Sequence, residues 1–94
     1  MDFKTLKKIY FIGIGGIGMS ALARYFKGLG MEIYGYDRLR SDLSIELEKE
    51  GIDVHYEENV EAIPKGIDLV VYTPAIPSTH TELLYFQSKA FPIM

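Results

Sequence analysis

The sequence predicts an α/β domain built on a parallel sheet, and two patterns lead to this prediction. Short apolar runs typical of buried strands alternate with helix-like segments along the chain, and glycines or prolines separate many of them. The 94 residues, of which 48% are hydrophobic, are enough for one modest core. Strands joined through helices imply right-handed crossovers, so we expect a three-layer domain with five parallel strands in the order 3-2-1-4-5.

Each strand is predicted from an apolar run. The clearest is Leu69-Val70-Val71-Tyr72, which follows a single acid, Asp68, and is typical of a strand buried on both faces. Phe91-Pro92-Ile93-Met94 has the composition of a strand that is only beginning. The predicted strands are residues 8–12, 32–36, 53–55, 68–72 and 91–94.

The first helix is predicted from the spacing of its apolar residues. Met19, Leu22, Ala23 and Phe26 recur at the intervals of one helix face, which predicts a helix over residues 17–28. A weaker helical turn is expected over residues 59–63.

The other two helices are predicted from their end signals. Ser41 or Asp42 can cap a second helix, which stops at Gly51. Thr79-x-x-Glu82 has the pattern of a capping box and is expected to open the last helix.

The most informative motif is Gly13-x-Gly15-x-x-Gly18, between the first strand and the first helix. Asp37 follows the next predicted strand, 19 residues beyond Gly18. This is the context expected of a nucleotide-binding strand–turn–helix–strand unit. Gly13 would allow a tight turn, Gly15 would let backbone N–H groups approach phosphates, and Gly18 would let the helix pack close to the sheet. The alternative is a strand–helix corner in which the glycines have only a steric role.

Residues that follow the predicted strands would meet at one rim, because the carboxyl ends of parallel strands share an edge. Asp37 could accept from a ribose hydroxyl or a base N–H, Arg38 could pair with phosphate, and Thr73 offers a hydroxyl. Each also has a simpler interpretation, as an exposed turn acid, a solvated arginine and ordinary turn chemistry. His55 and His80 have no partners at metal-binding spacing, so we interpret them as structural or solvated.

Composition excludes several other functions. The net charge of −3 and the pI near 5.3 leave no basic face for nucleic acid. The absence of cysteine excludes disulfides and zinc–thiolate sites. No apolar stretch approaches the ~18 residues of a membrane span, and lysines interrupt the N-terminal segment, so a cytoplasmic protein is expected. No G-x-x-x-x-G-K-[ST] loop marks an ATP site, and neither paired catalytic carboxylates nor a metal site stands out.

The segment from Ile9 to Ala23 resembles the N-terminal signature of the Mur ligases, because Gly15-Gly16 is followed directly by Ile17-Gly18-Met19-Ser20. Two further segments agree. Gly35-Tyr36-Asp37 is similar to the family's G-S-D, with Tyr36 in place of serine, and Tyr72-Thr73-Pro74-Ala75-Ile76-Pro77 is similar to its S-[ST]-A-I-P, with Pro74 in place of a hydroxyl residue. The resemblance covers essentially the whole chain. It is strongest to the members that join L-alanine to UDP-N-acetylmuramic acid in peptidoglycan precursor synthesis.

The resemblance implies a Rossmann-like domain that binds the UDP part of UDP-N-acetylmuramic acid, with no catalytic residue, metal or cofactor of its own. It also implies that ATP, Mg²⁺ and L-alanine bind to central and C-terminal domains absent from this chain. ATP would activate the muramic acid carboxylate for attack by the alanine amino group. The UDP-binding residues that the resemblance implies are Gly13, Gly15, Gly16, Ile17, Gly18, Met19, Ser20, Asp37, Arg38, Thr73, Pro74, Ala75 and Ile76.

Alternative functions remain open at this point. An NAD(P)-binding domain of a dehydrogenase or ion-channel regulator would carry the same glycines and Asp37. A non-catalytic interaction module with a vestigial site is another. Within the family, the enzyme that attaches recycled muropeptides to the same sugar nucleotide is a near neighbour, although its loop is usually less rich in glycine.

Overall fold

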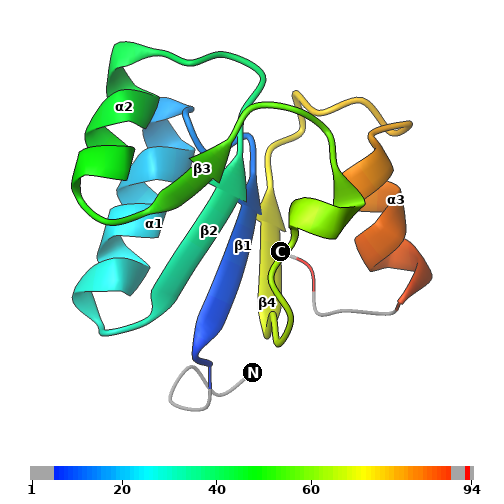
Figure 1. Ribbon diagram of the computed structural model, residues 1–94, viewed down its shortest axis with the longest axis horizontal. Coiled ribbons are helices and arrows are strands. Elements are labelled where there is room, and N and C mark those ends of the chain that lie inside the picture. Colours follow the sequence, from blue (N-terminus) through cyan, green and yellow to red (C-terminus); the bar gives the residue numbers. More distant parts are fainter. Residues whose placement is uncertain (1–5, 90–92, 94) are drawn as a thin grey trace.

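The fold is a four-stranded parallel sheet with helices on both faces (Figure 1), in a computed structural model that describes residues 6–89 and residue 93. Its strand order is β3-β2-β1-β4. Every neighbouring pair is parallel, as the sequence predicts. The strands are β1 (Lys8–Ile12), β2 (Glu32–Tyr36), β3 (Asp53–His55) and β4 (Leu69–Tyr72).

The predicted fifth strand is not found among the described residues. Ile93 forms an isolated parallel bridge to Val70 of β4, and residues 91, 92 and 94 of the expected strand lie outside the described residues. A strand needs a ladder of successive bridges, and a single bridge does not make one. The order 3-2-1-4-5 is therefore corrected to 3-2-1-4.

Helices cover the two faces of the sheet unequally. The helix α1 (Ile17–Gly28) and the helix α2 (Asp42–Lys49) lie together on one face, where the Arg24 guanidinium of α1 pairs with Glu50 just beyond α2. The helix α3 (Thr81–Ser88) and the 3₁₀ turn η2 (Val60–Ala62) lie on the other. Within the described part of the chain, none of the helices has the length and apolar character that crossing a bilayer requires.

The central strand β1 is buried from both sides, which explains its unbroken apolar sequence. Ile9 and Phe11 belong to the hydrophobic cluster under α1 and α2, whereas Tyr10 and Ile12 belong to the cluster under α3. All four side chains are fully buried. Successive strand residues face opposite sides, so one strand supplies both cores and gives the loop that follows it a rigid base.

The start of α2 settles which residue caps it. Ser41 is the N-cap, and its hydroxyl oxygen accepts a hydrogen bond from the Ser44 backbone N–H at 3.1 Å. In return, the Ser44 hydroxyl oxygen accepts one from the Ser41 backbone N–H at 2.9 Å. This reciprocal arrangement satisfies two backbone donors that a helix start otherwise leaves open.

Candidate functional site

The loop after β1 is held between the two neighbouring strands. The backbone N–H groups of Gly13 and Ile14 both donate to the Tyr36 carbonyl oxygen at the end of β2, at 2.8 and 3.0 Å. Gly13 has φ +90°, a conformation that L side chains rarely adopt, and a Cβ there would overlap the Thr73 methyl group beyond β4. Glycine is therefore required at the point where the chain turns off the central strand.

Asp37, which directly follows β2, binds the backbone of this loop through its carboxylate. Its Oδ2 accepts a hydrogen bond from the Gly15 backbone N–H at 2.7 Å, and its Oδ1 accepts one from the Leu39 N–H at 2.9 Å. A Cβ on Gly15 would lie 2.8 Å from Oδ2. The approach of this carboxylate therefore depends on glycine, which is a role for Gly15 that the motif alone did not reveal.

An open cavity of about 490 Å³ lies at the carboxyl ends of the strands, where a parallel sheet places its ligands. The loops after β1, β2 and β4 converge on it. Among the residues predicted to bind the ligand, those that line the cavity are Gly13, Gly15, Gly16, Asp37, Arg38, Thr73, Ala75 and Ile76.

The remaining predicted residues do not line the cavity. Ile17 and Pro74 are exposed, and Met19 is half-buried and packs against the core under α1. Ser20 is buried, and its hydroxyl donates to the Ile17 carbonyl oxygen at 3.0 Å within α1. Its backbone N–H also donates within the helix, to the Gly16 carbonyl oxygen at 2.8 Å.

Gly18 also differs from its prediction. It is exposed, and an added Cβ would meet no atom within 4 Å. The expectation that Gly18 allows close packing of the helix on the sheet is wrong, because the residue lies on the side of α1 that faces away from the sheet. In this loop the steric need for glycine is concentrated at Gly13 and Gly15.

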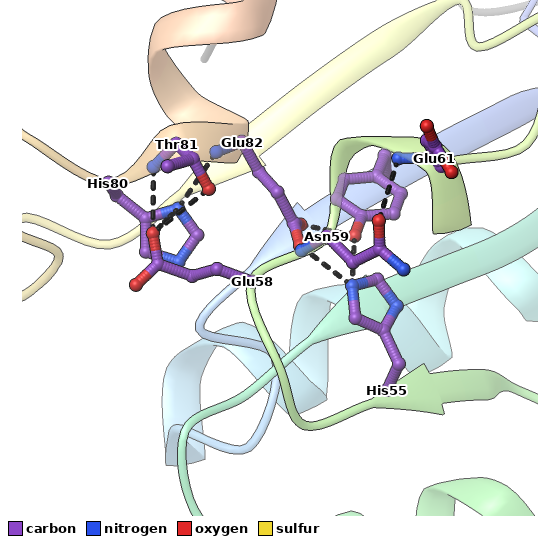
Figure 2. A network of polar contacts seen from close by, with 8 residues as sticks. His55, Glu58, Asn59, Glu61, His80, Thr81 and Glu82 are labelled. Carbon is purple, nitrogen blue, oxygen red and sulfur yellow. Dashed lines mark hydrogen bonds and ion pairs between the residues drawn. The ribbon is translucent and has the colours of Figure 1, made fainter.

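Glu58 is a cavity residue that the sequence did not single out. Its Oε1 accepts hydrogen bonds from the Thr81 backbone N–H at 2.8 Å and from the Thr81 hydroxyl at 3.1 Å, and it lies 3.7 Å from Nδ1 of His80 (Figure 2). The Thr81 N–H favours the charged carboxylate, so the pKa of Glu58 lies below its usual value. These contacts join the segment after β3 to the start of α3.

Glu82 is the centre of a buried polar network, and it is not part of a capping box. Its side chain is fully buried and accepts from the Tyr10 hydroxyl and from the Asn59 backbone N–H at 2.9 Å, while His55 Nε2 lies 2.8 Å away (Figure 2). Burial, together with the hydrogen bond to Glu82, raises the pKa of Tyr10 far above its usual value. His80 takes the cap instead, because its Nδ1 accepts from the Glu82 N–H.

The Thr79–Glu82 prediction was wrong because it used only local spacing. Glu82 has a second use that becomes visible only when the fold brings Tyr10 of β1 and His55 of β3 against it. His55 and His80 each make a contact within the chain, His55 through Nε2 to the Glu82 carboxylate and His80 through Nδ1 to the Glu82 N–H. In the described part of the chain, no three His, Asp or Glu side chains converge in a way that would hold a metal ion.

Comparison with known proteins identifies a family that this sequence matches. Residues 8–94 match the family model described as "Mur ligase family, catalytic domain". The UDP-N-acetylmuramate–L-alanine ligase of Parabacteroides distasonis is 52% identical over 100% of this chain, and that of Flavobacterium johnsoniae is 47% identical over 99%. The chain spans only 21% and 22% of those two proteins.

Two solved structures superpose closely on this chain. The crystal structure of UDP-N-acetylmuramate–alanine ligase MurC from Thermotoga maritima superposes with a TM-score of 0.85 at 34% identity, over 92% of this chain and 20% of that one. A murein peptide ligase from Psychrobacter arcticus has a TM-score of 0.84 over 94% of this chain and 18% of that one, and at 24% identity it supports the fold alone.

Proposed function

Since this chain belongs to the Mur ligase family, we propose that it is the part of an L-alanine-adding ligase that binds the UDP end of UDP-N-acetylmuramic acid. The observation that carries the proposal is the convergence of the glycine loop, Asp37 and the Thr73 loop on one cavity. The substrate is inferred from the relatives, which are UDP-N-acetylmuramate–L-alanine ligases.

The glycine loop is the proposed diphosphate site. The N-cap of α1 is Gly16, which has no side chain to satisfy the first N–H groups of the helix. These donors and the positive end of the helix dipole favour an anion. The cavity reaches Gly13, Gly15 and Gly16, so a diphosphate there would meet backbone rather than side chains.

The uridine would lie against the loops after β2 and β4. Each oxygen of Asp37 already accepts one backbone hydrogen bond, but a carboxylate can accept about four in all. It can therefore hold the loop and still accept from a ribose hydroxyl or a base N–H. Ala75 and Ile76 give the cavity an apolar wall, and the exposed Arg38 supplies its positive charge.

The contribution of this chain to catalysis would be positional. Anchoring the nucleotide end holds the distant muramic acid carboxylate in one place, which lowers the entropic part of the barrier. The residues present do not fit Mg²⁺–ATP, because no phosphate-binding lysine follows the glycine loop and no metal ligands converge in the described part. We assign ATP, Mg²⁺ and L-alanine to the rest of a longer protein, in the cytoplasm.

The proposal is tested by comparing UDP with NAD in calorimetric titrations of the chain. We expect UDP to bind more tightly than NAD, and Asp37→Ala to weaken UDP binding because the loop loses its clamp and the ligand loses an acceptor. Arg24→Ala, on the surface of α1 away from the cavity, is the matched control and should leave both affinities unchanged. Tighter binding of NAD than of UDP would contradict the proposal and favour a dehydrogenase-like domain.

We expect no ATP turnover from the 94 residues alone. Phosphoryl transfer needs a phosphate cradle, a metal ion and charge-stabilising groups held together, and this chain offers only an anion cradle. The assay is phosphate release with ATP, Mg²⁺, UDP-N-acetylmuramic acid and L-alanine, first with this chain and then with a longer one that continues to the length of the relatives. Turnover by the short chain would refute this division of labour.

A further inference from the structure

One ring nitrogen of His80, a residue of the cavity lining, is buried and has no partner among the described residues. The side chain of His80 is 3% exposed and lines the cavity together with Tyr36 and Glu58. Its Nδ1 accepts a hydrogen bond from the Glu82 backbone N–H at 3.2 Å and thereby caps α3. Its Nε2 has no hydrogen-bond partner among the described residues.

The cap decides which nitrogen carries the proton. Because Nδ1 accepts from an N–H group, the proton of the neutral ring must lie on Nε2. Nε2–H is therefore a buried donor with no acceptor in the part of the chain that the structure describes. Such groups are rare and costly in folded proteins, and they call for a specific explanation.

The surroundings indicate what kind of acceptor would suit this donor. The Glu58 carboxylate oxygen lies 3.7 Å from the same ring, so a phosphate oxygen placed there would be repelled. An uncharged oxygen would not. The Tyr36 ring packs edge-to-face on His80, with centroids 4.7 Å apart, and both residues are part of the cavity lining although each is only 5% exposed.

We propose that His80 is a specificity-determining residue of this site, whose Nε2–H donates to a carbonyl oxygen of the pyrimidine base. The proposal rests on the proposed function and deepens it. It assigns the base to the side of the cavity formed by Tyr36 and the start of α3, and the diphosphate to the glycine loop. A ligand carbonyl would supply an acceptor that the described residues do not provide.

Long-range ¹H–¹⁵N spectra of the two histidine rings test this directly, at pH 8, where an ordinary imidazole is neutral. We expect His80 to be the Nε2–H tautomer, and its Nε2–H proton to move downfield when uridine is added, as an N–H does when it gains an acceptor. The His55 ring lies outside the cavity lining and should not respond. Inorganic pyrophosphate should shift the amides of residues 15–19, at the glycine loop and the start of α1, and leave the His80 ring unchanged.

One substitution removes the Nε2–H donor and keeps the helix cap. His80→Asn retains a side-chain oxygen for the Glu82 N–H and removes Nε2–H. We expect uridine and UDP to bind about three- to tenfold more weakly, the effect of one hydrogen bond, and pyrophosphate to bind within about twofold of the original affinity. Equal weakening for pyrophosphate would show a general distortion of the site and would overturn the proposal.

The outcomes distinguish this proposal from the proposed function. If UDP shifts the loop amides but saturating uridine leaves the His80 Nε2–H signal unchanged, the role of His80 is refuted and UDP binding stands. If neither UDP nor pyrophosphate shifts the loop amides, the proposed function fails, and the assignment of His80 fails with it.

Discussion

Gly15→Val is expected to abolish UDP binding while the domain stays folded. The new side chain would begin 2.8 Å from Asp37 Oδ2, so the carboxylate must leave the Gly15 N–H, and the methyl groups would fill the space beside the loop amides. We expect the diphosphate to lose two charge-assisted hydrogen bonds to the loop amides. At about 1.5 kcal/mol each, this corresponds to an affinity loss of about a hundredfold or more. Calorimetry with UDP measures the loss, and thermal unfolding checks the fold.

Gly28→Ala is the control for this substitution. Gly28 ends the same helix, is exposed, and has no atom within 4 Å of an added Cβ. The variant should keep its UDP affinity. An unchanged affinity in Gly15→Val would show that phosphate recognition lies outside this loop.

Glu82→Ala is expected to cost about 3–5 kcal/mol of the free energy of unfolding, because it removes the acceptor shared by three buried or half-buried groups. Tyr10, His55 and the Asn59 N–H would each lose their partner, and these groups come from β1, the end of β3 and the start of η2. Urea denaturation measures the loss.

Tyr10→Phe is the matched control for Glu82→Ala. It removes one hydroxyl and leaves Glu82 with two partners, so we expect a smaller cost of about 1–2 kcal/mol. A Glu82→Ala protein within about 1 kcal/mol of the original would mean that the network contributes little to stability.

Much of the fold could be predicted from the sequence, because its signals are local. The bounds of β1, α1, β2 and β3 coincide with the predicted ranges, since apolar periodicity and glycine stops act within a few residues. The Thr79–Glu82 capping box failed because Glu82 is bound by Tyr10, 72 residues away in the sequence. No local pattern encodes a partner at that distance.

The residues of the candidate site also fall into two groups, those with a local signal in the sequence and those without one. Motif spacing and strand ends place the glycine loop, Asp37 and Thr73, and the cavity is lined by Asp37, by Thr73 and by three residues of that loop, Gly13, Gly15 and Gly16. Glu58 and His80 were missed as cavity residues, because a loop after the edge strand and a helix cap reach the rim only through tertiary packing. Gly18 shows the converse, since it matches the motif but has open space around it.

The most direct test of the central claim is a crystal structure of the chain with UDP bound. We predict the diphosphate within hydrogen-bond distance of the backbone N–H groups of residues 17–19 at the start of α1, beside the glycine loop, and the base between the loops that carry Asp37 and Thr73. UDP bound elsewhere on the molecule, or a diphosphate placed away from the glycine loop, would contradict the account.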